Sequence, residues 1–473
     1  MSRCDSTLDA ILRDAGPLPG ARVLGTDPAI VSGITHDSRN VRARTLFCCV
    51  TGRHHDGHAY AEAAIASGAS ALVVERPLQV SVPQVLVPSV RAAMGPLASA
   101  VFGHPSRRLR VVGVTGTNGK TTTSTLLAAI LRQAGRPSVA LGTLTGSMTT
   151  PEAPELQERL ARLAADGITD VVMEVSSHAL EQYRVDGTHF AAALFTNLSQ
   201  DHLDLHGTME AYFSAKCRLF EVGRSSLGVV NSDDEWGRRL LESATIPLRA
   251  FSAEDASDIV VTPSTLEMTW HTRHVEVGLG GSFNVMNVLA AATAASVLGV
   301  DDDDIVGALS EVEGVPGRFE SIRAGQAFDV LVDYAHTPDG LRAVLETARA
   351  AAAGRLIVVF GCGGDRDRDK RPLMGAVAVS GADLVIVTSD NPRSEDPRAI
   401  IDAILGGIPD VSLEQVLVEQ DRSFAIETAL RIARPGDVVI VAGKGHETTQ
   451  TIGDQVIDFD DRVVARSVLE RMR

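Results

Sequence analysis

The sequence lacks the features of a membrane or secreted protein. It has no uninterrupted apolar segment long enough to cross a bilayer, and its first residues, MSRCDSTLDAILRDAG, mix acids with apolar side chains. We therefore expect no signal peptide and no membrane insertion. Its five cysteines show neither metal-like nor disulfide-like spacing, and an odd count suits a reducing compartment. These features predict a cytoplasmic protein.

Basic residues are scarce relative to acids. The chain has 44 Lys and Arg against 60 Asp and Glu, a net charge of -16. Nucleic-acid backbones are held by clusters of Lys and Arg, so we expect no nucleic-acid partner. Small anionic substrates in local basic pockets remain open. With 473 residues, of which 44% are hydrophobic, the chain is too long for one ordinary core, which indicates two or three domains.

Three blocks of sequence predict three domains, at residues 1–107, 108–317 and 318–473. The first contains short strand-like runs such as TLFCCV and SALVVE, and the second alternates strand and helix from LRVVGVTG onward. The turn GVPGRFE leads into the third block, which has four continuous apolar strands: FDVLVDY, RLIVVFG, ADLVIVTS and DVVIVAG.

Strands that are apolar on both faces and alternate with helices indicate a mainly parallel sheet covered on both sides. We predict an α/β protein with a small N-terminal α/β domain, a central P-loop ATPase-like parallel sheet and a Rossmann-like C-terminal domain. Ligands of such sheets bind beyond the carboxyl ends of the strands. In the third block the polar motifs DYAHTPD, GCGGDRD, TSDNPR and AGKGHE each follow a strand.

The run VGVTGTNGKTTT, residues 112–123, predicts a phosphate-binding turn between a strand and a helix. It is shorter than a full Walker A motif, because Val114 stands where that motif has its first glycine. Glycines let backbone amides approach phosphate oxygens, the helix offers its positive end, and Lys120 adds a point charge. Thr121 or Thr122 can donate a hydroxyl to magnesium. The alternative is a glycine-rich turn that binds no ligand.

A carboxylate and an imidazole follow later strands of the second block. Glu174 ends the strand in VVMEVSSH, and His202 follows another strand in SQDHLDLHG. Strand ends of one sheet lie at the same edge, so both side chains can face a phosphate-bound magnesium. Alone, each residue is interpreted more simply as a cap or a surface residue.

The order of the motifs resembles the Mur ligases. TGTNGKTTT, MEVSSHAL, TNLSQDHLDLHG, AYFSAKCRLF, NVMNVLAA, GRFE, DYAHTPDGL, GCGGDRD, DNPR and AGKGHE follow one another as in that family. THDSR and TGRHHDG in the first block extend the resemblance over nearly the whole chain. The closest likeness is to the branch that adds the third peptide residue to UDP-N-acetylmuramoyl-L-alanyl-D-glutamate.

The resemblance implies an ATP-dependent ligase of peptidoglycan synthesis, acting as a cytoplasmic monomer. ATP phosphorylates the D-glutamyl carboxylate, and the amine of the incoming amino acid displaces phosphate from the acyl phosphate. The cofactors implied are ATP and Mg²⁺. Magnesium screens the negative charges, and a closed cleft keeps water from the acyl phosphate.

Residue by residue, the resemblance implies three groups around ATP. The ATP-binding group is Gly116, Thr117, Asn118, Gly119, Lys120, Thr121, Thr122, Asn287, Arg318, Asp333 and His336. The metal group is Thr121, Glu174, His202 and a carbamylated Lys216, and the catalytic group is Lys120, Lys216 and His202. From the residues alone, Lys216 is equally a solvated helical side chain, Asn287 a helix-surface residue and Arg318 a linker charge.

The resemblance also implies residues for the two remaining substrates. UDP-N-acetylmuramoyl-L-alanyl-D-glutamate would contact Ser38, Arg53, His54, His55, Thr149, Thr150, Ser176, Gln182 and Arg184. The incoming amino acid would contact Arg366, Asp390, Asn391, Pro392, Arg393, Gly443 and Glu447.

Arg393 favours meso-diaminopimelate as that amino acid. Diaminopimelate differs from lysine by a carboxylate at its far end, and arginine grips a carboxylate with two parallel hydrogen bonds. Glu447 suits the distal ammonium. Alternatively, Arg393 binds no substrate and forms a salt bridge within its own loop.

Other functions remain open at this point. A relative could add lysine instead, or glutamate to folate, although HDSR and DNPR disfavour the folate branch. A binding scaffold without catalysis is a third hypothesis, which the presence of Lys120, Glu174, His202 and Lys216 disfavours. TLTGSM before Thr149 and the stretch between Asp258 and Gly281 are shorter than we expect for the family.

Overall fold

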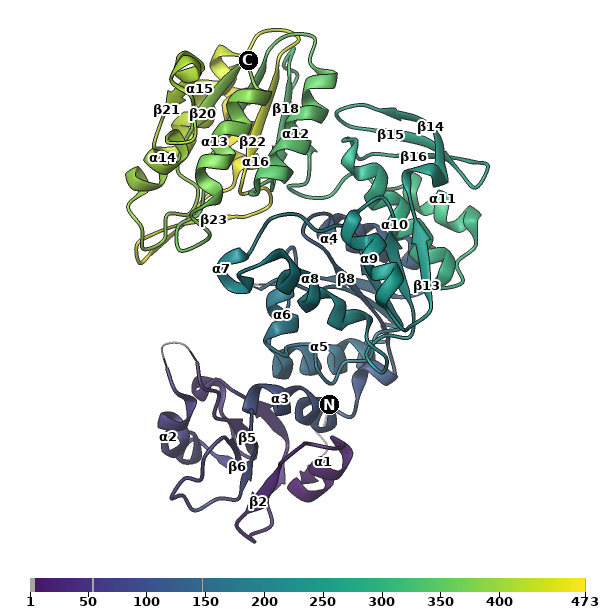
Figure 1. Cartoon of the computed structure of the whole chain (residues 1–473), viewed down its shortest axis with the longest axis vertical. Coiled ribbons are helices and arrows are strands. Elements are labelled where there is room, and N and C mark those ends of the chain that lie inside the picture. Colours follow the sequence, from purple (N-terminus) through teal and green to yellow (C-terminus); the bar gives the residue numbers. More distant parts are fainter. Residues whose placement is uncertain (1–4, 53–54, 147, 473) are drawn as a thin grey trace.

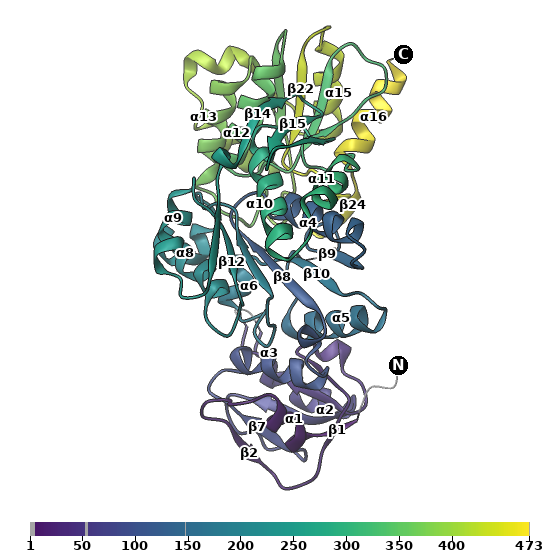
Figure 2. The ribbon, with the colours of Figure 1, turned by 90° about the vertical axis from the view of Figure 1, so that its right-hand side faces the viewer.

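The computed structural model describes residues 5–52, 55–146 and 148–472 of the chain. Three α/β bodies follow one another along its long axis, from the N-terminal residues at one end to the C-terminal residues at the other (Figures 1 and 2). The predicted fold class is confirmed, because each body contains a largely parallel sheet. No helix among the described residues is long and apolar enough to cross a membrane.

The N-terminal body is a five-stranded sheet in the order β2-β7-β6-β5-β4. TLFCCV and SALVVE provide two of its strands, as predicted, and Cys48 and Cys49 are buried in its core. The sheet strands are β2 (Arg22–Leu24), β4 (Gly33–Thr35), β5 (Thr45–Cys48), β6 (Ala69–Val74) and β7 (Gln84–Leu86). Around them are β1 (Ser6–Thr7), β3 (Ile30–Val31), α1 (Leu8–Asp14), α2 (Ala61–Ala66) and α3 (Val90–Val101).

The central body is a six-stranded parallel sheet in the order β13-β12-β11-β8-β10-β9. Its strands are β8 (Arg110–Thr115), β9 (Ser138–Leu141), β10 (Asp170–Glu174), β11 (Ala192–Phe195), β12 (Gly228–Asn231) and β13 (Leu248–Phe251). Successive side chains of β8 enter opposite cores, Val111 on one face and Val112 on the other. This is why the strand is apolar throughout.

Helices cover both faces of the central sheet. One face carries α4 (Lys120–Gln133), α10 (Phe283–Val297) and α11 (Asp302–Ser310). The other carries α5 (Ala153–Ala165), α6 (Ser177–Glu181), α8 (Met209–Cys217) and α9 (Glu235–Ser243). The short helix α7 (Leu203–His206) lies on the side of the central body nearest the C-terminal body (Figure 1). The stretch that we considered short forms an antiparallel sheet of β14 (Ala256–Val261), β15 (Leu266–Trp270) and β16 (Arg273–Val277).

The C-terminal body is a six-stranded sheet in the order β17-β18-β22-β19-β20-β21. All four predicted strands are present and parallel, and only β17 runs antiparallel. The strands are β17 (Glu320–Ser321), β18 (Asp329–Asp333), β19 (Leu356–Phe360), β20 (Leu384–Val387), β21 (Val416–Val418) and β22 (Val438–Ala442). The helices are α12 (Pro338–Ala351), α13 (Lys370–Gly381) and α14 (Pro397–Leu405) on one face, and α15 (Arg422–Ile432) and α16 (Asp461–Arg471) on the other.

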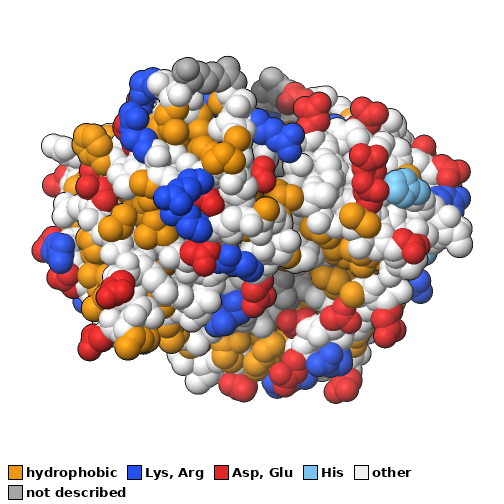
Figure 3. Space-filling view, turned by 90° about the horizontal axis from the view of Figure 1, so that it is seen from above, with side chains coloured by type: hydrophobic (Ala, Val, Ile, Leu, Met, Phe, Trp, Pro, Cys, Tyr) orange, Lys and Arg blue, Asp and Glu red, His pale blue; other side chains and the backbone are white. Residues whose placement is uncertain are grey.

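A hairpin of β23 (Thr449–Ile452) and β24 (Gln455–Asp458) lies on the side of this body that faces the central body (Figure 1). Viewed from above, the surface carries Lys, Arg, Asp and Glu side chains intermixed with apolar ones (Figure 3). That mixture is ordinary for the surface of a globular protein.

A buried ion pair fixes the carboxyl ends of two strands in the C-terminal body. Arg422 and Asp461 are both fully buried, and their side chains make two hydrogen bonds of 2.7 Å. The Arg422 guanidinium also donates to the carbonyl oxygens of Ser389 and Ala442, at 3.4 and 2.9 Å. The pair therefore links the loops that follow β20 and β22.

Replacement of Arg422 tests this link. Arg422→Met leaves the Asp461 carboxylate buried without its cation, so we expect the free energy of unfolding to fall by about 3–5 kcal/mol. Urea unfolding of the full chain, followed in its C-terminal transition, measures the change. Arg431→Met removes an exposed cation of the same helix, paired with Glu427, and should cost under about 1 kcal/mol. Equal losses in both variants would contradict a structural role for the buried pair.

Candidate functional site

The predicted phosphate loop is a strand, turn and helix in the structure. β8 ends at Thr115 and α4 begins at Lys120, and between them Gly116 and Gly119 have positive φ values of 150° and 86°. A Cβ atom on Gly116 would overlap the Thr196 hydroxyl, and one on Gly119 would overlap the Asn287 amide oxygen. Both positions therefore require glycine.

The segment after β11 holds this loop in place. The backbone amide of Thr117 donates to the Asn197 carbonyl and that of Asn118 donates to the Asn197 side-chain oxygen, both at 2.9 Å. The Thr196 hydroxyl donates to the Asn118 carbonyl at 2.6 Å. These hydrogen bonds hold the turn between β8 and α4 through Thr117 and Asn118, and none of them involves Gly116 or Gly119. Thr122 is buried on the first turn of α4.

Two lysines converge on one carbonyl oxygen of the loop. Lys120 Nζ donates to the Gly116 and Thr117 carbonyls at 3.0 and 2.8 Å, and Lys216 Nζ donates to the Gly116 carbonyl at 2.8 Å. Lys216 is only 1% exposed, so it is not a solvated helical side chain. Burial, together with the charge of Lys120, holds the pKa of Lys216 well below its ordinary value, and burial also lowers the pKa of Lys120. Two buried amines therefore lie within hydrogen-bond distance of the same loop carbonyl.

Glu174 lies buried at the end of β10 and faces the first turn of α4. Its carboxylate accepts hydrogen bonds from the Thr121 hydroxyl at 3.0 Å and from the backbone amide and hydroxyl of Thr143 at 2.9 and 3.1 Å. A Cβ atom on Gly142 would overlap this carboxylate, which shows how closely the backbone approaches it. The hydroxyl and carboxylate oxygens together are the hard donors that Mg²⁺ prefers.

His202 lies beyond β11, in a left-handed conformation with φ of 55° at the start of α7. Its ring is 4.6 Å from that of His178, and its Nε2 atom is 3.3 Å from the Asp201 carboxylate. Burial, outweighing the carboxylate, lowers the pKa of His202 to about 3, so the ring is neutral and able to bind a metal. No three His, Cys, Asp or Glu side chains of the described residues form a ready-made metal site.

The segment between the central and C-terminal bodies brings Arg318 onto the phosphate loop. Its guanidinium donates to the Thr121 hydroxyl at 2.8 Å and lies 4.3 Å from the centre of the Tyr334 ring. Asn287 is 6% exposed and lies against Gly119. Asn287 is therefore not a helix-surface residue, and Arg318 is not simply a linker charge. The Asp333 carboxylate accepts from the backbone amides of Phe319 and Ala335, both at 2.7 Å, and so fixes the backbone beside Arg318.

Five of the residues predicted for the sugar-peptide substrate lie together beside Glu174. The Thr150 hydroxyl donates to the Glu174 carbonyl at 2.9 Å and accepts from the Ser176 amide at 3.1 Å. Arg184 donates to the Thr150 carbonyl at 3.2 Å and to Gln182 at 2.7 Å. Thr149 is 3.0 Å from Thr143 through their hydroxyls. These contacts extend one polar network from the phosphate loop.

The other predicted sugar-binding residues belong to the N-terminal body. Ser38 begins a short 3-10 helix and is half-buried, and His55 is exposed. Arg53 and His54 lie outside the described residues. The sequence analysis missed Glu152, which lies between two arginines, 3.3 Å from Arg91 on α3 and 3.0 Å from Arg184. Its position after Thr149-Thr150-Pro151 was the available signal.

The loop Asp390-Asn-Pro-Arg393 follows β20. Arg393 has φ of 52°, and its backbone pairs with β23 through the Thr451 carbonyl at 3.0 Å and the Gly453 amide at 2.7 Å. Its guanidinium donates to the Gly364 carbonyl at 2.6 Å. Across the part of the chain that the structure describes, no carboxylate forms an ion pair with Arg393, so the internal salt bridge of the alternative interpretation is absent.

The remaining residues predicted for the amino acid surround this loop. The Asn391 amide donates to a Glu447 oxygen at 2.7 Å, and a Cβ atom on Gly443 would lie 2.6 Å from an Asp390 oxygen. Arg366 is exposed and donates to the Asp365 carbonyl at 3.2 Å. The sequence analysis missed Lys444, which is fully buried against Asn391 and Glu447.

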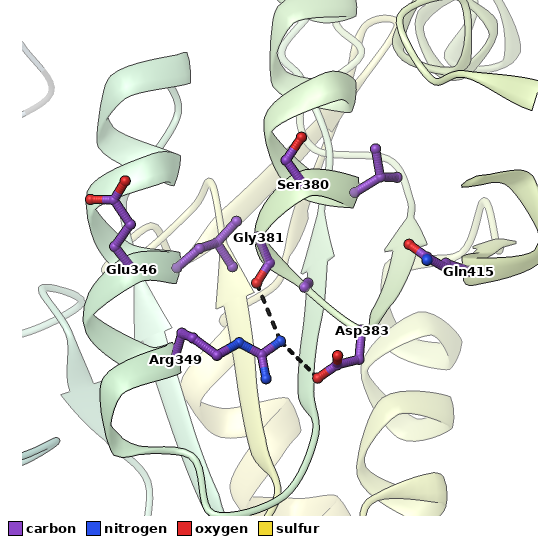
Figure 4. Close-up of a pocket in the computed structure, with 9 residues that line it drawn as sticks. Glu346, Arg349, Ser380, Gly381, Asp383 and Gln415 are labelled. Atoms are coloured by element: carbon purple, nitrogen blue, oxygen red, sulfur yellow. Dashed lines mark hydrogen bonds and ion pairs between the residues drawn. The ribbon is translucent and has the colours of Figure 1, made fainter. Parts of the chain in front are cut away.

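A surface hollow of about 550 Å³ lies at the other end of the C-terminal sheet (Figure 4). Arg349 in its wall donates to the Gly381 carbonyl at 3.4 Å and to Asp383 at 2.7 Å. Asp383 directly precedes β20, so this hollow is at the amino end of the strands. Ligands of parallel sheets bind at the carboxyl end, where the predicted residues lie.

Comparison with known families matches three segments of the chain. Residues 30–102 match the "Mur ligase family, catalytic domain", residues 114–295 the "Mur ligase middle domain", and residues 317–445 the "Mur ligase, glutamate ligase domain".

Curated relatives match nearly the whole chain. A protein of Syntrophomonas wolfei is 45% identical over 93% of this chain and 94% of its own, and one of Geobacillus kaustophilus is 46% identical over 96% and 98%. Both are named UDP-N-acetylmuramoyl-L-alanyl-D-glutamate--2,6-diaminopimelate ligase.

Solved structures agree in fold. A ligase of the same name has a TM-score of 0.65 and 36% identity over 94% of this chain and 95% of its own. MurF from Acinetobacter baumannii has a TM-score of 0.69 at 20% identity over 93% and 96%, which supports the fold alone.

Burial of His336 should make the stability of the protein depend on pH. Its Nδ1 atom is 2.9 Å from the Tyr334 carbonyl, and burial lowers its pKa from 6.5 to about 4. Below pH 6.5 the unfolded chain binds a proton that the folded chain does not, so stability falls as the pH drops toward 4. Relative to His336→Gln, the wild-type free energy of unfolding should fall by about 2 kcal/mol between pH 8 and pH 5.

Urea unfolding of both proteins at several pH values measures this difference. His274→Gln, at an exposed histidine of β16, is the control and should keep the wild-type pH profile. A difference between wild type and His336→Gln that stays constant with pH would contradict the burial of a neutral His336.

Proposed function

The chain belongs to the Mur ligase family, and we propose that it adds meso-diaminopimelate to UDP-N-acetylmuramoyl-L-alanyl-D-glutamate with ATP, in peptidoglycan synthesis. Its relatives of that name support the reaction, at 45–46% identity over nearly full length. The choice of diaminopimelate rests on the Arg393 guanidinium. It donates a hydrogen bond to a backbone carbonyl but forms no ion pair with a carboxylate among the described side chains. A substrate carboxylate is the ligand that this group lacks.

The phosphate loop binds ATP during the first step. Gly116 and Gly119 let the backbone approach the phosphates, the start of α4 offers its positive end, and Lys120 leaves its loop carbonyls to contact them. Arg318 and Asn287 border the same loop and complete the nucleotide site. Asp333 acts through the backbone beside Arg318, and His336 lies close by on the same segment.

Thr121 and Glu174 would hold Mg²⁺, together with His202 and phosphate oxygens. Their hydroxyl and carboxylate oxygens fit this ion, which keeps several waters and phosphate ligands and needs no all-protein cage. When bound, Mg²⁺ neutralises charge that develops as the terminal phosphoryl group moves to the D-glutamyl carboxylate.

Lys216 is carbamylated in the active enzyme. Its buried amine, whose pKa lies far below the ordinary value, is available as a neutral nucleophile. The nitrogen adds to carbon dioxide, and one proton leaves as the carbamate anion forms. The carbamate places a negative charge beside the Lys120 ammonium, which attracts it, and would offer a further oxygen to Mg²⁺.

The amino acid is held on the C-terminal body for the second step. Its amine attacks the acyl carbon, the bond from that carbon to the phosphate oxygen breaks, and inorganic phosphate leaves. Residues 1–107 hold uridine diphosphate, residues 108–317 hold ATP and the peptide end, and residues 318–473 hold diaminopimelate. The enzyme acts as a cytoplasmic monomer and excludes water by closing the bodies on one another.

The first experiment measures phosphate release by the purified full chain. With ATP, Mg²⁺ and UDP-N-acetylmuramoyl-L-alanyl-D-glutamate, we expect release and a tripeptide product with meso-diaminopimelate, but neither with L-lysine nor without an amino acid. Mass spectrometry identifies the product. A lysine product would contradict the role of Arg393 but keep the ligase, and nucleotide binding without any product would favour the scaffold hypothesis.

Arg393→Met tests the carboxylate contact. Loss of hydrogen bonds to a charged group costs about 1.5–3 kcal/mol, so kcat/KM for diaminopimelate should fall by about 10- to 150-fold. The KM for ATP should stay within about twofold, because the phosphate loop lies on a different sheet. Arg349→Met, at the opposite end of the C-terminal sheet (Figure 4), is the matched control and should retain wild-type rates. An equal rise in KM for ATP and diaminopimelate would contradict the assignment.

A further inference from the structure

Lys444 lies between two glycines directly after β22, in the sequence AGKGHE. Gly443 and Gly445 have positive φ values of 115° and 54°. A lysine in such a turn at the carboxyl end of a strand is where a phosphate-binding residue is expected. The side chain of Lys444 is fully buried instead, and its ammonium points into the C-terminal body.

All three protons of the Lys444 ammonium have acceptors in the protein. Nζ is 2.7 Å from the Thr449 carbonyl, 3.0 Å from Glu447 Oε2 and 3.3 Å from Asn391 Oδ1. An ammonium has three donors, so no proton remains for a ligand. The residue therefore acts on its neighbours and not on a substrate.

The contacts of Lys444 fix the side chains of Asn391 and Glu447. Asn391 Oδ1 also accepts from the Thr451 amide at 3.0 Å, and its Nδ2 donates to Glu447 Oε2 at 2.7 Å. Glu447 Oε2 thus accepts from both Lys444 and Asn391. The Glu447 side chain is still 30% exposed, and its other oxygen makes no hydrogen bond with any residue that the structure describes. One carboxylate oxygen is anchored while the other faces outward.

We propose that Lys444 is a positioning and specificity-determining residue of the amino-acid site. It anchors one oxygen of Glu447 so that the other receives the distal ammonium of the incoming amino acid. This inference rests on the proposed function of the chain as a diaminopimelate ligase. Arg393 recognises the distal carboxylate, and the Lys444–Glu447 pair recognises the amino group on the same carbon.

A substrate analogue separates this role from general support of the fold. 2-Aminopimelate keeps both carboxylates of diaminopimelate but lacks the distal amino group. The ratio of kcat/KM for diaminopimelate to that for 2-aminopimelate measures recognition of this group alone. A general structural defect lowers both values together and leaves the ratio unchanged.

In Lys444→Met, which keeps the apolar stem, we expect the ratio to fall at least tenfold while the KM for ATP changes less than about twofold. Glu447→Gln should lower the ratio similarly. The double variant should be no worse than Glu447→Gln alone, because both changes remove the same contact. Arg349→Met is the control cation of the same body and should keep the wild-type ratio.

Glu447→Gln also carries the test if Lys444→Met fails to fold. It leaves the buried Lys444 ammonium without its counter-charge, so the thermal midpoint of the C-terminal body should fall along with the ratio. With an active wild type, an unchanged ratio in Lys444→Met would overturn the role of Lys444 alone. An unchanged ratio in Glu447→Gln would overturn recognition by the Lys444–Glu447 pair. A wild type that forms no tripeptide with diaminopimelate would instead overturn the proposed function, and this inference with it.

Discussion

The buried carboxylate of Glu174 is the contact on which the rest of the site depends. One oxygen accepts from Thr121 on the helix of the phosphate loop and from the Thr143 amide, and its backbone carbonyl accepts from Thr150. The residues that we propose for ATP, the metal and the peptide are thus all in contact with one strand end. The Glu174 carboxylate is buried, and each of its oxygens accepts at least one hydrogen bond. These hydrogen bonds hold the carboxylate in one orientation.

The residues that we propose for the reaction come from two sheets, and in both they follow the carboxyl ends of the strands. The central sheet supplies the phosphate loop, Glu174 and His202, and the C-terminal sheet supplies the loops after β20 and β22. Arg318 connects them physically, since it follows the central body in sequence and donates to Thr121 of the phosphate loop. This hydrogen bond ties the start of the C-terminal body to the phosphate loop.

The sequence predicted the features that depend on local patterns. Continuous apolar strands, the glycines of the phosphate loop and the polar motifs at strand ends follow from periodicity and backbone sterics, and the structure contains all of them. The roles of Lys444, Glu152 and Arg422 were not predicted, because each depends on partners far away in the chain. Arg422 is an ordinary helical arginine until the fold buries it against Asp461 and two strand ends.

The central claim is that the phosphate loop activates a substrate carboxylate and does not merely hydrolyse ATP. Labelling the D-glutamyl side-chain carboxylate with ¹⁸O tests it most directly, by mass analysis of the phosphate released during one turnover. The account predicts that one ¹⁸O atom appears in inorganic phosphate, because the bond between the acyl carbon and that oxygen breaks when the amine attacks. Phosphate free of ¹⁸O, with the tripeptide still formed, would contradict it.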